Sequence, residues 1–123
     1  MKELLSFALV GVGGGVGAMI RASLGRWNGK WPHGTLVANL LGSALIPWAV
    51  IAGPKLAGDW ILPLIAVGFC GGLTTYSTLI FETIGIARKG EPERGLGYLM
   101  GTLAGCFFIV LIGFLLARRV FAA

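Results

Sequence analysis

Five consecutive hydroxyl residues, Thr74 to Thr78, interrupt a stretch that has no charged side chain from residue 60 to residue 81. They follow two glycines, Gly71 and Gly72, which weaken a helix. A broken helix exposes backbone carbonyls at the end of its first half and amides at the start of its second, and such ends bind ions. We therefore expect an ion-handling break in this segment. A simple helix kink is the alternative, because the same residues would produce it.

The segment around these residues is one of four long apolar runs. Hydrophobic residues make up 56% of the 123 residues, charged residues make up 12%, and the mean hydropathy is +0.86, values typical of an integral membrane protein. We expect one all-α transmembrane domain over residues 1–123. Its four spans are predicted at approximately 4–24, 35–52, 60–86 and 96–117. A helix over residues 60–81 would be about 33 Å long, which places the expected break near the bilayer midplane.

The first run resembles a signal peptide in its position, but arginines follow it and no small-residue cleavage site does. We interpret it as a retained helix. Four hairpinned spans place both termini on one side of the membrane. Basic residues on that side are Lys2, Lys55, Arg118 and Arg119, and those on the other are Arg21, Arg26, Lys30, Arg88, Lys89 and Arg94. So small a difference is a weak orientation signal. We interpret the net charge of +5 as anchoring to anionic lipid rather than nucleic-acid binding, since no basic patch is interleaved with aromatic residues.

The chain has 21 glycines, and several are spaced four apart within the runs. Small residues at this spacing allow helix backbones to approach closely in a membrane. The expected ridges are Gly97, Gly101 and Gly105 on the last span, and on the first span Gly11 with Gly15, Gly13 with Gly17, and Gly14 with Ala18. Four short helices can scarcely enclose a polar pathway alone, so we expect an oligomer.

No constellation of residues indicates an enzyme. Gly13, Gly15 and Ala18 match a dinucleotide-binding fingerprint, but no preceding strand or suitably spaced acid accompanies them. His33 is the only histidine, which excludes a catalytic His pair or a His-rich metal site. Cys70 and Cys106 lie within spans, where small buried hydrophobic roles are expected. The functions that remain are the passage of a solute through the membrane and the packing of helices.

A few polar side chains within the spans bear on that choice. For Asn39, interhelical hydrogen bonding and pore lining are equally consistent with the sequence. Arg21 and Glu82 lie near span ends, where snorkelling to the interface is the ordinary outcome. Thr102 alone indicates little, because a hydroxyl can bond its own helix.

Three linked motifs resemble one known family. They are "GGGVGAMIR" (13–21), "GTLVANLLG" (34–42) and "GFCGGLTTYSTL" (68–79), which in this order and spacing look like the Fluc (CrcB-type) fluoride channels. The resemblance covers essentially the whole chain. It implies an antiparallel, dual-topology dimer in the cell (inner) membrane, with two fluoride pores beside a structural sodium ion on the dimer axis.

The resemblance also implies roles for individual residues. Backbone carbonyls of Gly71 and Thr74 would hold the sodium ion, Asn39 would line the pore, and Arg21 would lie in its vestibule. Ser77, Thr78 and Thr102 would be additional hydrogen-bond donors. The family's usual "TTFSTF" here reads "TTYSTL", so its two pore phenylalanines correspond to Tyr76 and Leu79. Tyrosine keeps an aromatic edge, whose positive potential suits an anion, and leucine does not.

The expected function is therefore passive export of cytoplasmic fluoride by a homodimer. One alternative is a heteromeric channel in which a paralogous subunit supplies the missing aromatic ring. A second is a small multidrug-type exporter, although that class needs a carboxylate deep in the first span, where this chain has only Glu3 at the edge. A third is a non-conducting membrane assembly subunit, which would leave the hydroxyl-rich break unexplained.

Overall fold

The computed structural model describes residues 1–121, and no β-strand occurs among them. Four helical segments are long and apolar enough to cross a membrane. They comprise α1 (Lys2–Leu24), α2 (His33–Ile51), an interrupted third segment from Leu62 to Arg88, and α6 (Pro92–Phe121). The expected all-α protein with four spans is confirmed.

The third segment consists of three helical pieces. A π-helix, η2 (Leu62–Phe69), continues into one α-helical turn, α4 (Cys70–Leu73). After three non-helical residues the chain resumes as α5 (Ser77–Arg88). The predicted break is therefore confirmed, and it lies just after the two glycines, at the first hydroxyl residues.

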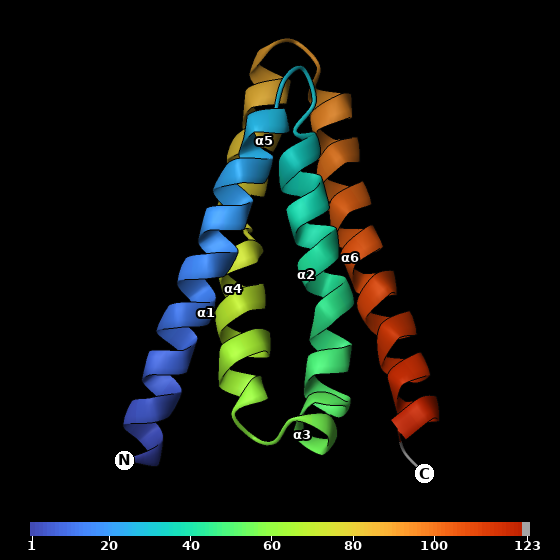
Figure 1. Cartoon of the computed structure of the whole chain (residues 1–123). Coiled ribbons are helices and arrows are strands. Elements are labelled where there is room, and N and C mark those ends of the chain that lie inside the picture. Colours follow the sequence, from blue (N-terminus) through green and yellow to red (C-terminus); the bar gives the residue numbers. More distant parts are fainter. Residues whose placement is uncertain (122–123) are drawn as a thin grey trace.

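Short elements connect the long helices. A 3₁₀ turn, η1 (Gly25–Trp27), and a loop lead from α1 to α2, and α3 (Gly53–Leu56) lies between α2 and the third segment. Figure 1 shows both termini and α3 at one end of the molecule, and the α1–α2 loop and α5–α6 turn at the other. The up-and-down order therefore matches the arrangement expected from four hairpinned spans.

Helix α1 packs against η2 and α4 through glycines. A Cβ atom at Gly13 or Gly17 would overlap the carbonyl oxygens of Leu64 and Phe69, respectively. Gly72 makes the reciprocal approach, since a Cβ there would overlap the backbone of α1. Of the ridges expected on α1, the one formed by Gly13 and Gly17 and, at Gly14, the one formed by Gly14 and Ala18 thus contact the neighbouring segment.

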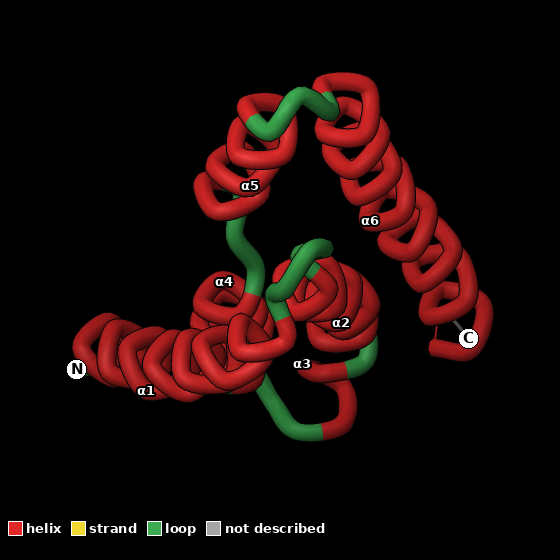
Figure 2. The backbone as a smooth tube through the Cα atoms, turned by 90° about the horizontal axis from the view of Figure 1, so that it is seen from above, coloured by secondary structure: helices red, strands yellow, loops and turns green. Residues whose placement is uncertain are grey.

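Other predicted ridges remain open in the single chain. Nothing lies within 4 Å of a Cβ atom built at Gly11, Gly15, Gly97 or Gly101, whereas one at Gly105 would lie 3.3 Å from Leu40 Cδ2. Helix α6 packs on α2 and α5, and the linker after α4 carries the chain across to α5 (Figure 2). Gly97 and Gly101 therefore leave open space between α6 and the start of α2.

Candidate pore site at the helix break

Thr74 ends the first half of the interrupted helix. Its backbone is extended, with φ −84° and ψ 152°. Both its amide N and its Oγ1 donate to the carbonyl of Cys70, each at 2.9 Å. The side chain thus caps the end of α4, and the chain is free to leave the helix.

Asn39 of α2 holds the linker in place. Its Nδ2 donates to the carbonyl of Thr75 at 3.0 Å, and its Oδ1 accepts from the amide of Thr75 at 2.7 Å. Asn39 is buried, with 5% of its surface exposed. An amide side chain pairs with one backbone residue in this way only where no helix or strand already uses those groups. Asn39 therefore acts as interhelical glue, and one Nδ2 hydrogen remains for another acceptor.

Thr75 also begins the second half of the helix. Its Oγ1 accepts from the amide of Thr78 at 3.2 Å and lies 3.0 Å from Thr78 Oγ1. This is the bond with which a Thr side chain satisfies a free amide at a helix start. Ser77 is exposed, and its Oγ lies 3.4 Å from Thr75 Oγ1. The hydroxyl run thus builds the ends of both half-helices.

Arg21 reaches the break from α1. Its Nε donates to the carbonyl of Gly72 at 2.9 Å. That carbonyl has no helical partner, because the chain four residues later has left the helix. The cationic side chain therefore stabilises the negative end of α4 instead of snorkelling outward.

A cavity of about 260 Å³ lies beside the break, between α2, the linker and α6. It brings together four of the predicted pore residues: Asn39, Tyr76, Leu79 and Thr102. The predicted donors Ser77 and Thr78 and the predicted vestibule residue Arg21 are not among its lining residues. Leu79 is buried within its own chain (2% exposed), whereas Tyr76 is largely exposed (65%).

Five further lining residues were not predicted as site residues, namely Ser43, Ile46, Thr75, Leu103 and Cys106. Ser43 lies one helical turn after Asn39, and Cys106 lies one turn after Thr102, so spacing by four residues could have identified both. Cys106 is partly exposed and not a fully buried hydrophobe as expected, whereas Cys70 is fully buried. Both thiols are free.

Glu82 does not snorkel to the interface, because its carboxylate is fully engaged inside the chain. Oε1 accepts from Asn28 Nδ2 at 2.9 Å and from Thr35 Oγ1 at 2.7 Å, and Oε2 accepts from the Tyr98 hydroxyl at 2.8 Å. Asn28 Oδ1 also accepts from the amides of Gly34 and Thr35 at the start of α2. This cluster links α5 to α2 and α6. Sequence alone gave no signal for it, because its members are far apart along the chain.

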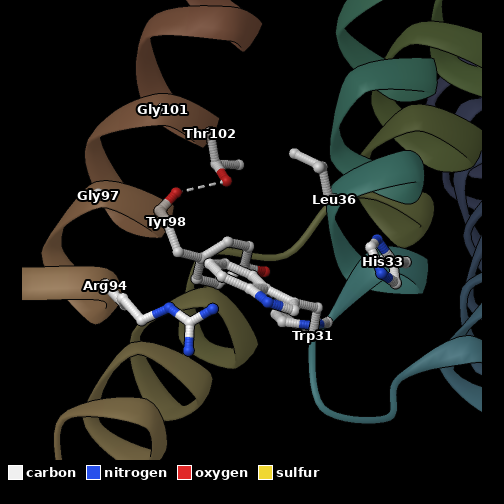
Figure 3. A pocket seen from close by; sticks show the side chains of 9 residues that line it. Trp31, His33, Leu36, Arg94, Gly97, Tyr98, Gly101 and Thr102 are labelled. Carbon is white, nitrogen blue, oxygen red and sulfur yellow. Dashed lines mark hydrogen bonds between the residues drawn. The ribbon is translucent and has the colours of Figure 1, made fainter. Parts of the chain in front are cut away.

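A second cavity, of about 340 Å³, lies between the start of α2 and α6. Figure 3 shows Arg94 and Trp31 towards one end and Thr102 towards the other. Thr102 lines both cavities, and its hydroxyl donates to the carbonyl of Tyr98 at 2.7 Å. Thr102 is therefore the residue that both cavities share, one cavity lying near the α1–α2 loop and the other at the helix break.

The break also presents backbone oxygens suited to a hard cation. No group of three or more His, Cys, Asp or Glu residues within residues 1–121 could hold a metal ion. The carbonyls of Gly71 and Thr74 accept no hydrogen bond from any residue in that range. Carbonyls of unwound membrane helices are ligands that Na⁺ uses in transport proteins. The carbonyl oxygens of Gly71 and Thr74 thus suit a sodium ion as ligands, and its remaining ligands would come from other groups.

The fold and the site define a small multi-pass membrane protein with an interrupted third helix and a cavity at the interruption. A family model described as "CrcB-like protein, Camphor Resistance (CrcB)" matches residues 8–114, and the chain belongs to this family.

Curated relatives agree over most of the chain. A protein of Bordetella petrii named "Fluoride-specific ion channel FluC" is 38% identical, with 89% of this chain and 88% of the relative aligned. One of the same name from Bordetella bronchiseptica is 40% identical over 93% of this chain and 92% of the relative. "Fluoride-specific ion channel FluC 2" of Moorella thermoacetica is 36% identical over 95% of this chain and 100% of the relative.

Proposed function

We propose that this chain is the subunit of a passive, fluoride-specific channel in the inner (cell) membrane, and that it lets cytoplasmic fluoride leave the cell. The observation that carries the proposal is the cavity at the helix break, where Asn39, Tyr76 and Thr102 converge. The names of the relatives identify the ion. A channel of this kind performs no catalysis.

The path runs along α6 and ends at the break. Fluoride enters beside Trp31 and Arg94, passes Tyr98 and Thr102, and reaches the cavity beside Asn39. Fluoride is small and strongly hydrated, so a narrow passage must replace lost water with hydrogen-bond donors. The remaining Nδ2 hydrogen of Asn39 is one such donor. Thr102 becomes another only when its hydroxyl rotates away from Tyr98, while Ser77 and Thr78 act nearer the start of α5.

A sodium ion is held by the carbonyls of Gly71 and Thr74 and by the same two carbonyls of a second copy. Those two carbonyls are among the oxygens of the break that accept no hydrogen bond within residues 1–121. The ion supplies positive charge and joins the two breaks. Arg21, bonded to the neighbouring carbonyl of Gly72, keeps the end of α4 in the conformation that presents these oxygens.

A second, antiparallel copy completes the pore. The single chain leaves the cavity open on one side, leaves open space beside Gly97 and Gly101, and leaves Tyr76 largely exposed. Two-fold symmetry lets the same surface serve both subunits. Leu79 lies inside its own subunit, so the absence of an aromatic ring at this position changes the wall of the cavity. Tyr76, in contrast, projects towards the partner. A homodimer is proposed; a paralogous partner is the alternative that the Tyr76 and Leu79 replacements favour.

Growth in fluoride tests the proposal in cells. The chain is expressed in a bacterium from which its own fluoride exporters have been deleted, with the empty vector as control. Expression is expected to restore growth in millimolar sodium fluoride and to leave growth in sodium chloride unchanged. Failure to restore growth, with the protein present in the membrane fraction, would contradict a self-sufficient channel; rescue by a co-expressed paralogue would then identify a heteromer.

A further inference from the structure

The end of the molecule opposite the termini carries a further pocket beside the entrance of the proposed fluoride path, with which it shares Trp31 and Arg94. It has a volume of about 320 Å³, room for about ten water molecules. Its lining residues are Lys30, Trp31, Ile86, Lys89, Glu91 and Arg94. They come from the α1–α2 loop and the α5–α6 turn, which Figure 1 shows together at this end. Three of the six are cationic and one is anionic.

The charges of this pocket are not all paired. Arg94 Nη1 bonds Glu91 Oε1 at 2.7 Å, and the guanidinium lies 5.4 Å from the centre of the Trp31 ring. Glu91 and Arg94 thus neutralise one another. Within residues 1–121 the structure gives no ion pair to Lys30 or Lys89. The pocket therefore holds two uncompensated positive charges beside an aromatic ring.

A shallow apolar groove continues from the same two lysines along α5. A smaller cavity of about 150 Å³ shares Lys30, Ile86 and Lys89 with the first and extends past Gly85 to Phe81. Phe81, Gly85 and Lys89 are four residues apart and lie on one face of the helix, so the groove runs about 12 Å from Lys89 towards the middle of the span. Gly85 has no neighbour within 4 Å of a Cβ position, and Phe81 is 78% exposed.

The one carboxylate in this groove, Glu82, has hydrogen-bond partners of its own and forms no ion pair with the lysines within residues 1–121. Glu82 lines the groove, but its two oxygens accept hydrogen bonds from Asn28, Thr35 and Tyr98. Positive charge at the level of the headgroups, an interfacial tryptophan and an apolar channel directed into the membrane are the features that an anionic phospholipid complements.

We propose that this surface, formed by Lys30, Trp31, Phe81, Gly85 and Lys89, is a binding site for an anionic glycerophospholipid. The phosphate lies between Lys30 and Lys89, and one acyl chain follows the groove over Gly85 to Phe81. The site is separate from the helix break, and the proposal does not depend on fluoride passage.

Native mass spectrometry of the detergent-solubilised chain, titrated with dioleoyl phosphatidylglycerol, tests the headgroup contacts. The variant Lys30→Gln/Lys89→Gln is expected to bind this lipid about 25-fold more weakly, about fivefold per lysine. Lys30→Arg/Lys89→Arg keeps the charge and is expected to bind like wild type. A control, Lys2→Gln/Arg119→Gln, removes the same charge from the opposite end. Equal weakening by the two Gln pairs, or equal binding of phosphatidylcholine by wild type, would overturn the site.

Gly85→Leu tests the groove. Leucine favours the helix, and nothing within residues 1–121 lies within 4 Å of its Cβ position, so the helical circular dichroism spectrum is expected to be unchanged while phosphatidylglycerol binds several-fold more weakly. Unchanged binding would remove the acyl chain from the proposal. Displacement of the lipid by millimolar inorganic phosphate would identify a free-phosphate site instead. Disulfide dimers formed through Gly85→Cys would show that a second copy covers this face. Displacement by phosphate or formation of these dimers would overturn the proposal of a lipid site.

Discussion

Asn39 joins α2 to the break through two hydrogen bonds with one residue, Thr75. Replacing it with leucine, which is similar in size and donates nothing, leaves the amide and the carbonyl of Thr75 unpaired. We expect Asn39→Leu to lower stability by about 1–3 kcal/mol and fluoride efflux roughly tenfold or more. Ser43→Ala alters the same cavity wall without touching the linker and is the control. Wild-type efflux through Asn39→Leu would remove this side chain from the mechanism.

Cys106 offers a chemical test of the cavity, because it is partly exposed there while Cys70 is fully buried. A small, cationic methanethiosulfonate reagent reacts with accessible thiolates. We expect it to reduce fluoride efflux from vesicles containing wild-type protein or Cys70→Ser, and to leave efflux through Cys106→Ser unchanged. Inhibition that persists in Cys106→Ser would mean that the reagent, and the water that carries it, reaches the pathway at a site other than Cys106.

At the scale of elements, the contact between α1 and α4 depends on glycines with no room for a side chain. Gly17→Val would overlap the backbone at Phe69, whereas Gly15→Val has open space in the single chain. We expect Gly17→Val to destabilise the fold by about 1–3 kcal/mol, seen as a lower melting temperature in detergent by circular dichroism. Gly15→Val should melt close to wild type. Equal melting temperatures for wild type and Gly17→Val would contradict the described packing.

The Glu82 cluster holds the second half of the broken helix against its neighbours. Glu82→Ala leaves the Asn28, Thr35 and Tyr98 donors without their shared acceptor. The expected loss is about 1–3 kcal/mol of stability, measured by thermal unfolding, because buried donors then lack partners. Glu93→Ala, at an exposed position in the first turn of α6, is the matched control. A similar, small effect of both substitutions would show that the cluster does not hold α5.

Sequence predicted the elements better than their contacts. Apolar runs separated by charged turns indicate four spans, and glycines followed by hydroxyls indicate the break. Three glycine ridges on α1 have equivalent spacing, so periodicity does not predict which of them contact η2 and α4. The pairing of Asn39 with Thr75 depends on how α2 is placed along the linker, and one sequence carries no information on that placement. The same applies to Glu82, whose partners lie in three other segments.

For the whole molecule, the open cavity at the break and the exposed Tyr76 leave one surface incomplete. We propose that a second copy covers that surface, and this makes sufficiency of the single gene product the central claim. Tyr76 and Leu79 bear on it most directly, since one projects from the break and the other lines the cavity.

Fluoride efflux from liposomes that contain only this purified chain tests that claim. A fluoride electrode follows release after the membrane potential is collapsed, and chloride-loaded liposomes serve as the comparison. We predict rapid, passive loss of fluoride and retention of chloride. No fluoride efflux from folded, reconstituted protein, or equal release of both anions, would contradict a self-sufficient fluoride channel.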